Sequence, residues 1–156
     1  MKNALLILTL AFGIVACNGT KKLSTEYMYP GESQISLRKG PCFGQCPVFE
    51  FSIDGTGTAT YNGKKFTDKS GKHAKQFTAE ETNSVFKLFE SSDFFSFEDE
   101  YIANVSDLPG AWITFKHKGQ EKEIYAYFKV PQELVDLIAS ADALAATEGW
   151  KPTETE

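Results

Sequence analysis

The sequence lacks the marks of an enzyme, a nucleic-acid binder or a membrane-spanning protein. It contains no nucleophile-elbow, metalloprotease or phosphate-loop motif, so no catalytic residue is predicted. Lys and Arg number 16 against 21 Asp and Glu, and the resulting net charge of −5 argues against nucleic acid as a partner. The apolar run at residues 4–15 falls short of the roughly 20 residues that a spanning helix needs.

The first residues do have the layout of a bacterial signal peptide. A positive charge precedes the apolar run, and small residues follow it. The tetrad Ile14-Val15-Ala16-Cys17 resembles the lipobox, whose cysteine takes diacylglycerol before cleavage. Residues 1–16 are therefore expected to be removed, and Cys17 to become the lipidated N-terminus that holds the chain on a membrane. The alternative is an ordinary secretory peptide cut near Ala16, which leaves an unpaired thiol in an oxidising compartment.

The remaining chain divides by composition into three parts. Residues 17–33 are polar without periodicity and are expected to form a lipidated, flexible tether. Residues 34–150 have the length of a single domain, and residues 151–156 bury nothing and are expected to be a disordered tail. Because Asn18 rather than aspartate follows the lipidated cysteine, the outer membrane facing the periplasm is the favoured location.

The periodicity within residues 34–150 predicts two hairpins. Residues 35–37 and 49–53 alternate apolar and polar side chains, and residues 58–61 follow across the glycine-bearing turn at residues 54–57. Residues 112–115 and 123–128 flank Lys118-Gly119, which gives the second hairpin. Asn62-Gly63 predicts a further turn, and the lysine-rich residues 72–75 predict a loop.

Two helices are predicted between and after these strands. Thr78 followed by Glu81 has the capping-box spacing, and the apolar periodicity that follows predicts a helix from about Ala79 to Ser91. Pro131 occupies a first-turn position ahead of a second helix with one apolar face. The fold class predicted is α+β, an antiparallel sheet built from hairpins with two helices packed on one face.

The motif Gly40-Pro41-Cys42-Phe43-Gly44-Gln45-Cys46-Pro47 is the unusual feature of the chain. In an exported protein whose Cys17 carries lipid, an even pair of cysteines remains, which favours a structural disulfide between Cys42 and Cys46. Gly44 allows the tight backbone turn that brings the two sulfur atoms together.

Two other interpretations of this motif stay open. A C-x-x-x-C-P run resembles the copper site of thioredoxin-like copper chaperones, although in those proteins a helix follows the motif and here a strand is predicted. The two cysteines could also join His73 and His117 in a zinc site, but both histidines lie among lysines, where a solvated histidine is usual. No metal or other cofactor is therefore predicted.

Acidic residues gather after the first predicted helix. Such a cluster could bind calcium or act as an acid and base pair, but no calcium-loop spacing is present, so a solvated connection is expected. The members are Asp93, Glu98, Asp99, Glu100 and Asp107.

The cysteine motif, followed by Asp54-Gly55-Thr56-Gly57, resembles the start of an uncharacterised bacterial family of envelope lipoproteins, domain of unknown function 6438. Phe94-Phe95 and a proline-started final helix that ends near Trp150 fall in the order which that family shows. The resemblance covers about Gln34 to Trp150 and implies a domain boundary, but it brings no activity, substrate or catalytic residue.

These observations predict a lipid-anchored, non-enzymatic envelope domain that binds a protein, glycan or small ligand through its sheet or its cysteine loop. The alternative is a thiol redox or copper-handling lipoprotein that uses Cys42 and Cys46. A binding module should keep these sulfur atoms oxidised and buried, whereas redox or metal chemistry needs them accessible and reducible. An enzyme that acts on a cell-wall polymer through paired carboxylates is a third, weaker hypothesis.

Overall fold

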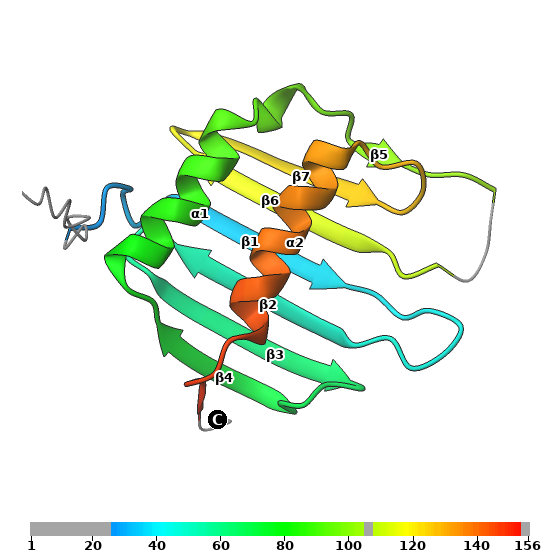
Figure 1. Ribbon diagram of the computed structural model, residues 1–156, viewed down its shortest axis with the longest axis horizontal. Coiled ribbons are helices and arrows are strands. Elements are labelled where there is room, and N and C mark those ends of the chain that lie inside the picture. The colour runs from blue at the N-terminus through cyan, green and yellow to red at the C-terminus, as the bar shows by residue number, and fades with distance from the viewer. Residues whose placement is uncertain (1–25, 105–107, 154–156) are drawn as a thin grey trace, which may run out of the picture.

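The structure, a computed structural model, describes residues 26–104 and 108–153 and has one sheet with both helices on the same face (Figure 1). The elements in chain order are β1 (Gln34–Lys39), β2 (Val48–Asp54), β3 (Thr58–Lys65), β4 (Gly71–Gln76), α1 (Ala79–Ser91), the 3-10 helix η1 (Phe94–Ser96), β5 (Glu100–Tyr101), β6 (Ala111–His117), β7 (Gln120–Ala126), α2 (Gln132–Ala146) and β8 (Lys151–Pro152). The predicted α+β class is confirmed. None of the helices in these two ranges is long and apolar enough to cross a membrane.

The sheet has the strand order β5-β7-β6-β1-β2-β3-β4-β8. Every neighbouring pair is antiparallel except β5 and β7, which run parallel. Both predicted hairpins are confirmed: β2 and β3 join through residues 55–57, and β6 and β7 join through Lys118 and Gly119. Strand β1 lies between β6 and β2, so it separates the two hairpins and pairs with one strand of each.

Alternating burial along the strands explains which face carries the core. In β1, Ile35 and Leu37 are buried while Ser36 between them is half-buried on the opposite face. The same alternation buries Ile53 and Ile113 completely. Each aliphatic side chain of this size removed from water contributes about 1.5–3 kcal/mol, so the apolar face must be covered, and α1 and α2 cover it.

The capping box predicted for α1 is present. Thr78 Oγ1 accepts a hydrogen bond from the backbone N of Glu81 (3.3 Å), and the Glu81 carboxylate accepts one from the backbone N of Thr78 (2.9 Å). Hydrogen bonds from Thr78 lower the pKa of Glu81. The helix spans Ala79–Ser91, as predicted. Helix α2 begins at Gln132, with Pro131 as its N-cap rather than its first helical residue.

The predicted tether is wrong for residues 26–33, the part of it that the structure describes. The Tyr29 ring lies in the core, 9% exposed, with its centroid 5.0 Å from that of Phe86. The backbone N of Met28 donates to Asn83 Oδ1 (2.8 Å), and Ser33 is fully buried. Tyr29 and Ser33 are isolated buried side chains in a segment without hydrophobic periodicity, so the sequence pattern did not predict their burial. Residues 1–25, with the predicted signal peptide and Cys17, lie outside the described residues.

Two further expectations about the sheet are wrong. Asn62 and Gly63 lie within β3 rather than in a turn. The backbone of Lys69 comes close to Gly63, and a Cβ at position 63 would lie only 1.7 Å from Lys69 O, so this strand position requires glycine. The predicted loop at residues 72–75 belongs to β4, which pairs with β3 along its length and with the two-residue strand β8 on its other side.

The predicted disordered tail is wrong at its start. Lys151 and Pro152 form β8 and pair with Ala74 and His73 of β4. The backbone N of Thr153 donates to Lys72 O at 3.0 Å. Backbone pairing of β8 with β4 needs no buried side chain, so the hydrophobic pattern of the sequence did not predict it.

Candidate functional site

A groove of about 580 Å³ crosses the face of the sheet opposite α1 and α2. Its volume lies in the range of small-ligand sites. Side chains from β1, β2, β3, β4, β6 and β7 line it, so it draws on both hairpins, and Thr153 contributes at the end next to Lys72.

Small hydroxyl side chains form the middle of this groove. Ser36 pairs across the strands with Thr114 on one side and Ser52 on the other, and Ser52 pairs with Thr60. The hydroxyls of Ser52 and Thr60 hydrogen-bond to each other at 2.8 Å. Larger residues of the next row rise beside them, because side chains on one face repeat every second residue. This neighbouring row, in strand order, consists of Trp112, Arg38, Glu50, Asn62 and Lys72.

Stacked planar groups build one end of the groove. The rings of Trp112 and Tyr125 stack with centroids 4.5 Å apart, and the guanidinium carbon of Arg38 lies 3.9 Å from the Trp112 ring centroid. Tyr127 continues the stack, 5.9 Å from Tyr125. Cation–π and ring stacking favour this arrangement of Arg38 and Trp112 in the absence of a ligand.

Two glycines make room for this stack. A Cβ at Gly110 would lie 2.7 Å from the Tyr125 ring, and one at Gly40 would lie 3.0 Å from the Trp112 ring. The two glycines also hydrogen-bond to each other, Gly40 N to Gly110 O at 2.8 Å. The rings therefore lie against bare backbone, in positions that any larger residue would obstruct.

Charged groups in the groove are balanced. Arg38 and Lys72 face two acids, Glu50 and Glu123, and Arg38 Nη2 lies 3.9 Å from Glu123 Oε1. A hydrogen bond from Lys64 lowers the pKa of Glu50, so this carboxylate stays ionised. The groove thus offers hydrogen-bond donors and acceptors in similar number, and its lining carries both positive and negative side chains.

The cysteine loop lies beside the aromatic end of the groove. The two Sγ atoms of Cys42 and Cys46 lie at disulfide distance, with Cα atoms 5.7 Å apart. Both cysteines are half-buried, whereas the side chain of Phe43 between them is 88% exposed. Pro41, Cys42 and Phe43 share a shallow second depression with the aromatic stack.

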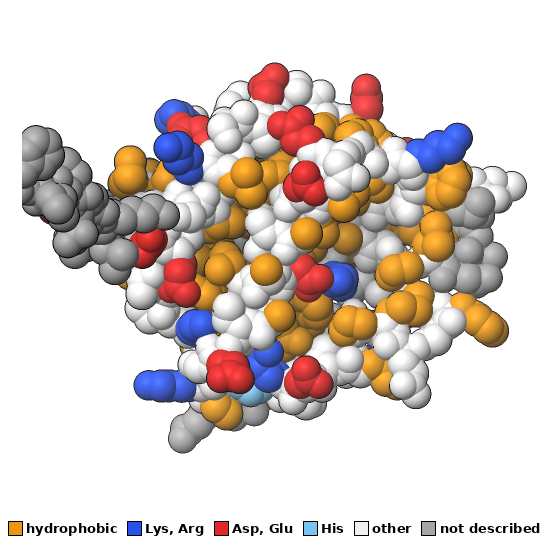
Figure 2. Space-filling model, in the orientation of Figure 1, with side chains coloured by type: hydrophobic (Ala, Val, Ile, Leu, Met, Phe, Trp, Pro, Cys, Tyr) orange, Lys and Arg blue, Asp and Glu red, His pale blue; other side chains and the backbone are white. Residues whose placement is uncertain are grey.

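Hydrophobic side chains gather at the end of the molecule that carries this loop, on the right in Figure 2. The exposed members in the loops there are Phe43 (88%), Phe66 (47%), Ile102 (56%) and Leu108 (40%). Residue 26 lies at the opposite end of the sheet (Figure 1). The loop end therefore faces away from the point where the described chain begins.

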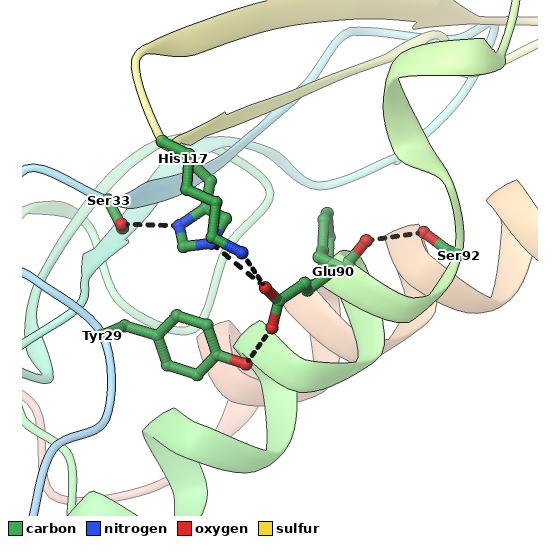
Figure 3. Close-up of polar contacts among 7 residues, drawn as sticks. Tyr29, Ser33, Glu90, Ser92 and His117 are labelled. Atoms are coloured by element: carbon green, nitrogen blue, oxygen red, sulfur yellow. Dashed lines mark hydrogen bonds and ion pairs between the residues drawn. The ribbon is translucent and has the colours of Figure 1, made fainter.

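A second polar cluster lies at the end of the sheet near residue 26, with Tyr29, Ser33 and His117 buried and Glu90 and Lys118 at the surface. His117 Nδ1 shares a hydrogen bond with Ser33 Oγ (2.9 Å), and its Nε2 faces Glu90 Oε1 at 3.4 Å (Figure 3). Glu90 also accepts hydrogen bonds from Lys118 Nζ (2.6 Å) and Tyr29 OH (3.0 Å). The Lys118 and Tyr29 hydrogen bonds lower the pKa of Glu90 to about 2, and burial together with Glu90 raises the pKa of Tyr29 to about 12.

This cluster has the residue types of a hydrolase triad but not its geometry. A nucleophilic serine must be accessible, and Ser33 is fully buried. Figure 3 shows Ser33 and Glu90 on opposite sides of the imidazole, with Tyr29 beside Glu90. The serine contacts Nδ1 and the carboxylate faces Nε2, so the cluster joins three parts of the chain and does not activate a nucleophile.

The histidines are not where the zinc hypothesis needs them. His117, the last residue of β6, contacts Ser33 just before the start of β1, while the cysteine loop follows the end of β1. His73 lies in β4, with its Nδ1 3.1 Å from Gly71 O. The expectation that both are solvated is wrong for His117, which is 6% exposed.

The acidic cluster is spread along an exposed connection. Asp93 has a left-handed backbone, and Asp99 forms an ion pair with Lys122 at 3.0 Å. Asp107 lies outside the described residues. Within residues 26–104 and 108–153, no group of three or more His, Cys, Asp or Glu side chains could hold a metal ion. The residues that follow Pro47 form strand β2, not the helix of a copper chaperone.

The cysteine loop was predicted from the sequence, whereas the groove and the cluster around His117 were not. The alternation in residues 112–115 did place Trp112 and Thr114 on the face opposite Ile113. Only the strand register brings Arg38 and Glu50 beside them.

Comparison with known proteins gives one match. The family model described as a domain of unknown function (DUF6438) matches residues 33–145. No curated protein and no solved structure matches the chain. The matched residues include the cysteine loop, both helices and every strand of the sheet except β8. The chain therefore belongs to the DUF6438 family.

Proposed function

We propose that this protein is a non-enzymatic binding module of the bacterial envelope, anchored by lipid on Cys17, and that its ligand occupies the groove on the open face of the sheet. One observation carries the proposal. A groove of about 580 Å³ lies on the face that neither helix covers, and its wall holds Arg38 and Trp112 in one stacked arrangement. Side chains organised before binding lose less conformational freedom when a ligand arrives.

A lipid anchor on Cys17 is compatible with the position of residue 26, where the described chain begins, at one end of the sheet. Residues 18–25 separate Cys17 from the described part of the chain, and a segment of that length spans at most about 29 Å. The domain then stays close to the membrane, with the end near residue 26 toward it. The cysteine loop lies at the opposite end of the sheet from residue 26 (Figure 1), so in an anchored chain we expect it to face away from the membrane.

A site-specific crosslinking experiment in the native host tests the proposal. A photoreactive amino acid replaces Thr60 in the groove or, as a control, Lys87 on the exposed side of α1. We expect a covalent adduct of defined mass from position 60 and none from position 87. The adduct should disappear when Ser52→Trp fills the groove. Equal adducts at both positions, or none at position 60, contradict the proposal.

A thiol redox function is the second candidate, because the paired sulfur atoms lie in a loop that is open to solvent around Phe43. Equilibration of the purified protein with dithiol buffers of known potential separates the two functions. A structural disulfide has a reduction potential below about −300 mV, whereas redox proteins lie above it. A value near −200 mV would favour the redox function.

A further inference from the structure

The floor of the groove is a continuous row of hydroxyl groups. Thr114, Ser36, Ser52 and Thr60 stand side by side on four adjacent strands, β6, β1, β2 and β3. Neighbouring strands lie about 4.8 Å apart, so the row extends about 14 Å across the sheet. A ligand that follows this row is elongated and meets a hydroxyl at each step. Ser52 and Thr60 bond to each other and Thr114 donates to Glu123, but a hydroxyl can take part in more than one hydrogen bond, so each can still bond to a ligand.

The charges beside this row match a ligand without net charge. Arg38 and Lys72 line the groove together with Glu50 and Glu123, and each acid has a basic neighbour, Lys64 for Glu50 and Arg38 for Glu123, so both signs of charge lie along the row. An anion would meet the two carboxylates, and a cation would meet Arg38 and Lys72. An uncharged ligand with many hydroxyls avoids both repulsions and hydrogen-bonds to either sign of group.

The aromatic end adds an apolar contact. Trp112 is covered on its faces by Tyr125 and Arg38, so it presents a ring edge to the groove. The contact available at this edge is van der Waals packing, which a ligand with C–H surfaces between its hydroxyls can make while its polar groups bond to the floor. A sugar ring has such alternating surfaces.

The sheet face is less suited to a peptide. An extended peptide gains most of its affinity by pairing its backbone with an exposed strand edge. The strands under the groove floor, β6, β1, β2 and β3, are each paired on both sides. The backbone N–H and C=O groups of a peptide on this face would have only the side chains of the groove as hydrogen-bond partners from the protein.

From these four observations we infer that the groove binds an uncharged oligosaccharide of about three sugar units, along the hydroxyl row and with one unit against Trp112. The inference rests on the proposed function, because it names the ligand class for the same groove.

An array of uncharged oligosaccharides of two to six units, built from hexoses and N-acetylhexosamines, provides the first test with the purified full chain. The sugar that binds best is then titrated by calorimetry and by fluorescence in a Trp150→Phe background, so that the signal comes from Trp112 alone. We expect saturable binding and a change in Trp112 emission. Trigalacturonate, an anionic trisaccharide, should bind at least tenfold more weakly.

Variants place the sugar in the groove. Ser52→Trp and, independently, Thr60→Arg obstruct the floor and should abolish binding, and circular dichroism checks that each variant is folded. Glu123→Gln keeps the shape but weakens a charged hydrogen bond, with an expected loss of about tenfold. Lys87→Ala on α1 is the matched control and should bind as the unaltered protein does.

The outcomes separate this inference from the proposed function. If no uncharged sugar on the array binds while the crosslink at position 60 persists, the inference is overturned and the proposed function stands. A peptide in that crosslink would identify the other ligand class. Sugar binding that survives both groove variants also overturns the inference, and absence of both sugar binding and crosslink overturns both proposals.

Discussion

The hydroxyl of Ser33 and the Nδ1 atom of His117 lie 2.9 Å apart, both in buried residues, and this hydrogen bond joins the segment before β1 to the end of β6. Tyr29, four residues earlier, packs on Phe86 of α1 and donates to Glu90. The first described residues are thus part of the folded domain.

Loss of the buried hydroxyl should destabilise the domain. Ser33→Ala leaves His117 Nδ1 without its partner, and a buried unsatisfied group costs about 1–3 kcal/mol. Urea denaturation measures the change in the free energy of unfolding. Ser91→Ala, at an exposed position of α1, is the control and should change it by less than about 0.5 kcal/mol. Equal effects of the two substitutions contradict the role assigned to Ser33.

The pKa of Glu90 sets a pH dependence. Its folded-state pKa is lowered from 4.5 to about 2 by Lys118 and Tyr29. The contribution of Glu90 to stability is therefore fully present above pH 4.5 and is lost as the pH falls toward about 2. Because the side chain is 40% exposed, solvent screens much of this contribution. A carbon-13 NMR titration of the carboxyl should give a midpoint well below 4.5, and a midpoint at 4.5 would contradict the contacts described.

Substitution of Gly110, which lies against the aromatic stack, should destabilise the domain. In Gly110→Ala the added Cβ meets the Tyr125 ring at 2.7 Å and displaces it from Trp112. Overpacking of this kind costs about 1–3 kcal/mol. Near-ultraviolet circular dichroism should lose the signal of the stacked rings. Gly31→Ala, whose Cβ meets only Thr56 Cγ2 at 3.4 Å, is the matched control and should keep both signal and stability.

The paired cysteines should behave as a structural bridge. The prediction that Cys42 and Cys46 form a disulfide is checked by intact mass with and without reductant, and two freely alkylated cysteines in unreduced protein would rule it out. Replacement of both by serine should destabilise the fold by about 2 kcal/mol without abolishing it, because the closed loop is short.

Lipidation of Cys17 stays a prediction from the tetrad that ends at this residue. Labelled palmitate supplied to the native host should be incorporated into the protein, and Cys17→Ala should abolish incorporation and release the protein from membranes. A Cys17→Ala variant that still takes up palmitate would show that the anchor lies elsewhere.

The features predicted correctly from the sequence are those set by neighbouring residues. The capping box between Thr78 and Glu81 fixes the start of α1 within three residues of chain. The turn at Lys118 and Gly119 fixes the register of β6 with β7, because both residues adopt positive φ.

The features missed depend on contacts between distant residues. Gly63 resembles a turn glycine after Asn62, and only its approach to Lys69 O shows why it lies inside a strand. Tyr29 reaches the core through Phe86, 57 positions later, with no periodicity around it to predict burial. The groove likewise exists only once β1 pairs with both β2 and β6 and brings Ser36 between Ser52 and Thr114.

The binding proposal is tested most directly by the accessibility of the groove in the native envelope. Ser52→Cys places one thiol on the groove floor, and Lys87→Cys places one on α1 as the control; each is labelled with a membrane-permeant maleimide in intact cells and in purified protein. If a ligand occupies the groove, position 52 is labelled several-fold less in cells than in purified protein, while position 87 is labelled equally in both. Equal labelling of position 52 in the two settings would contradict the proposal that the open face is the binding surface.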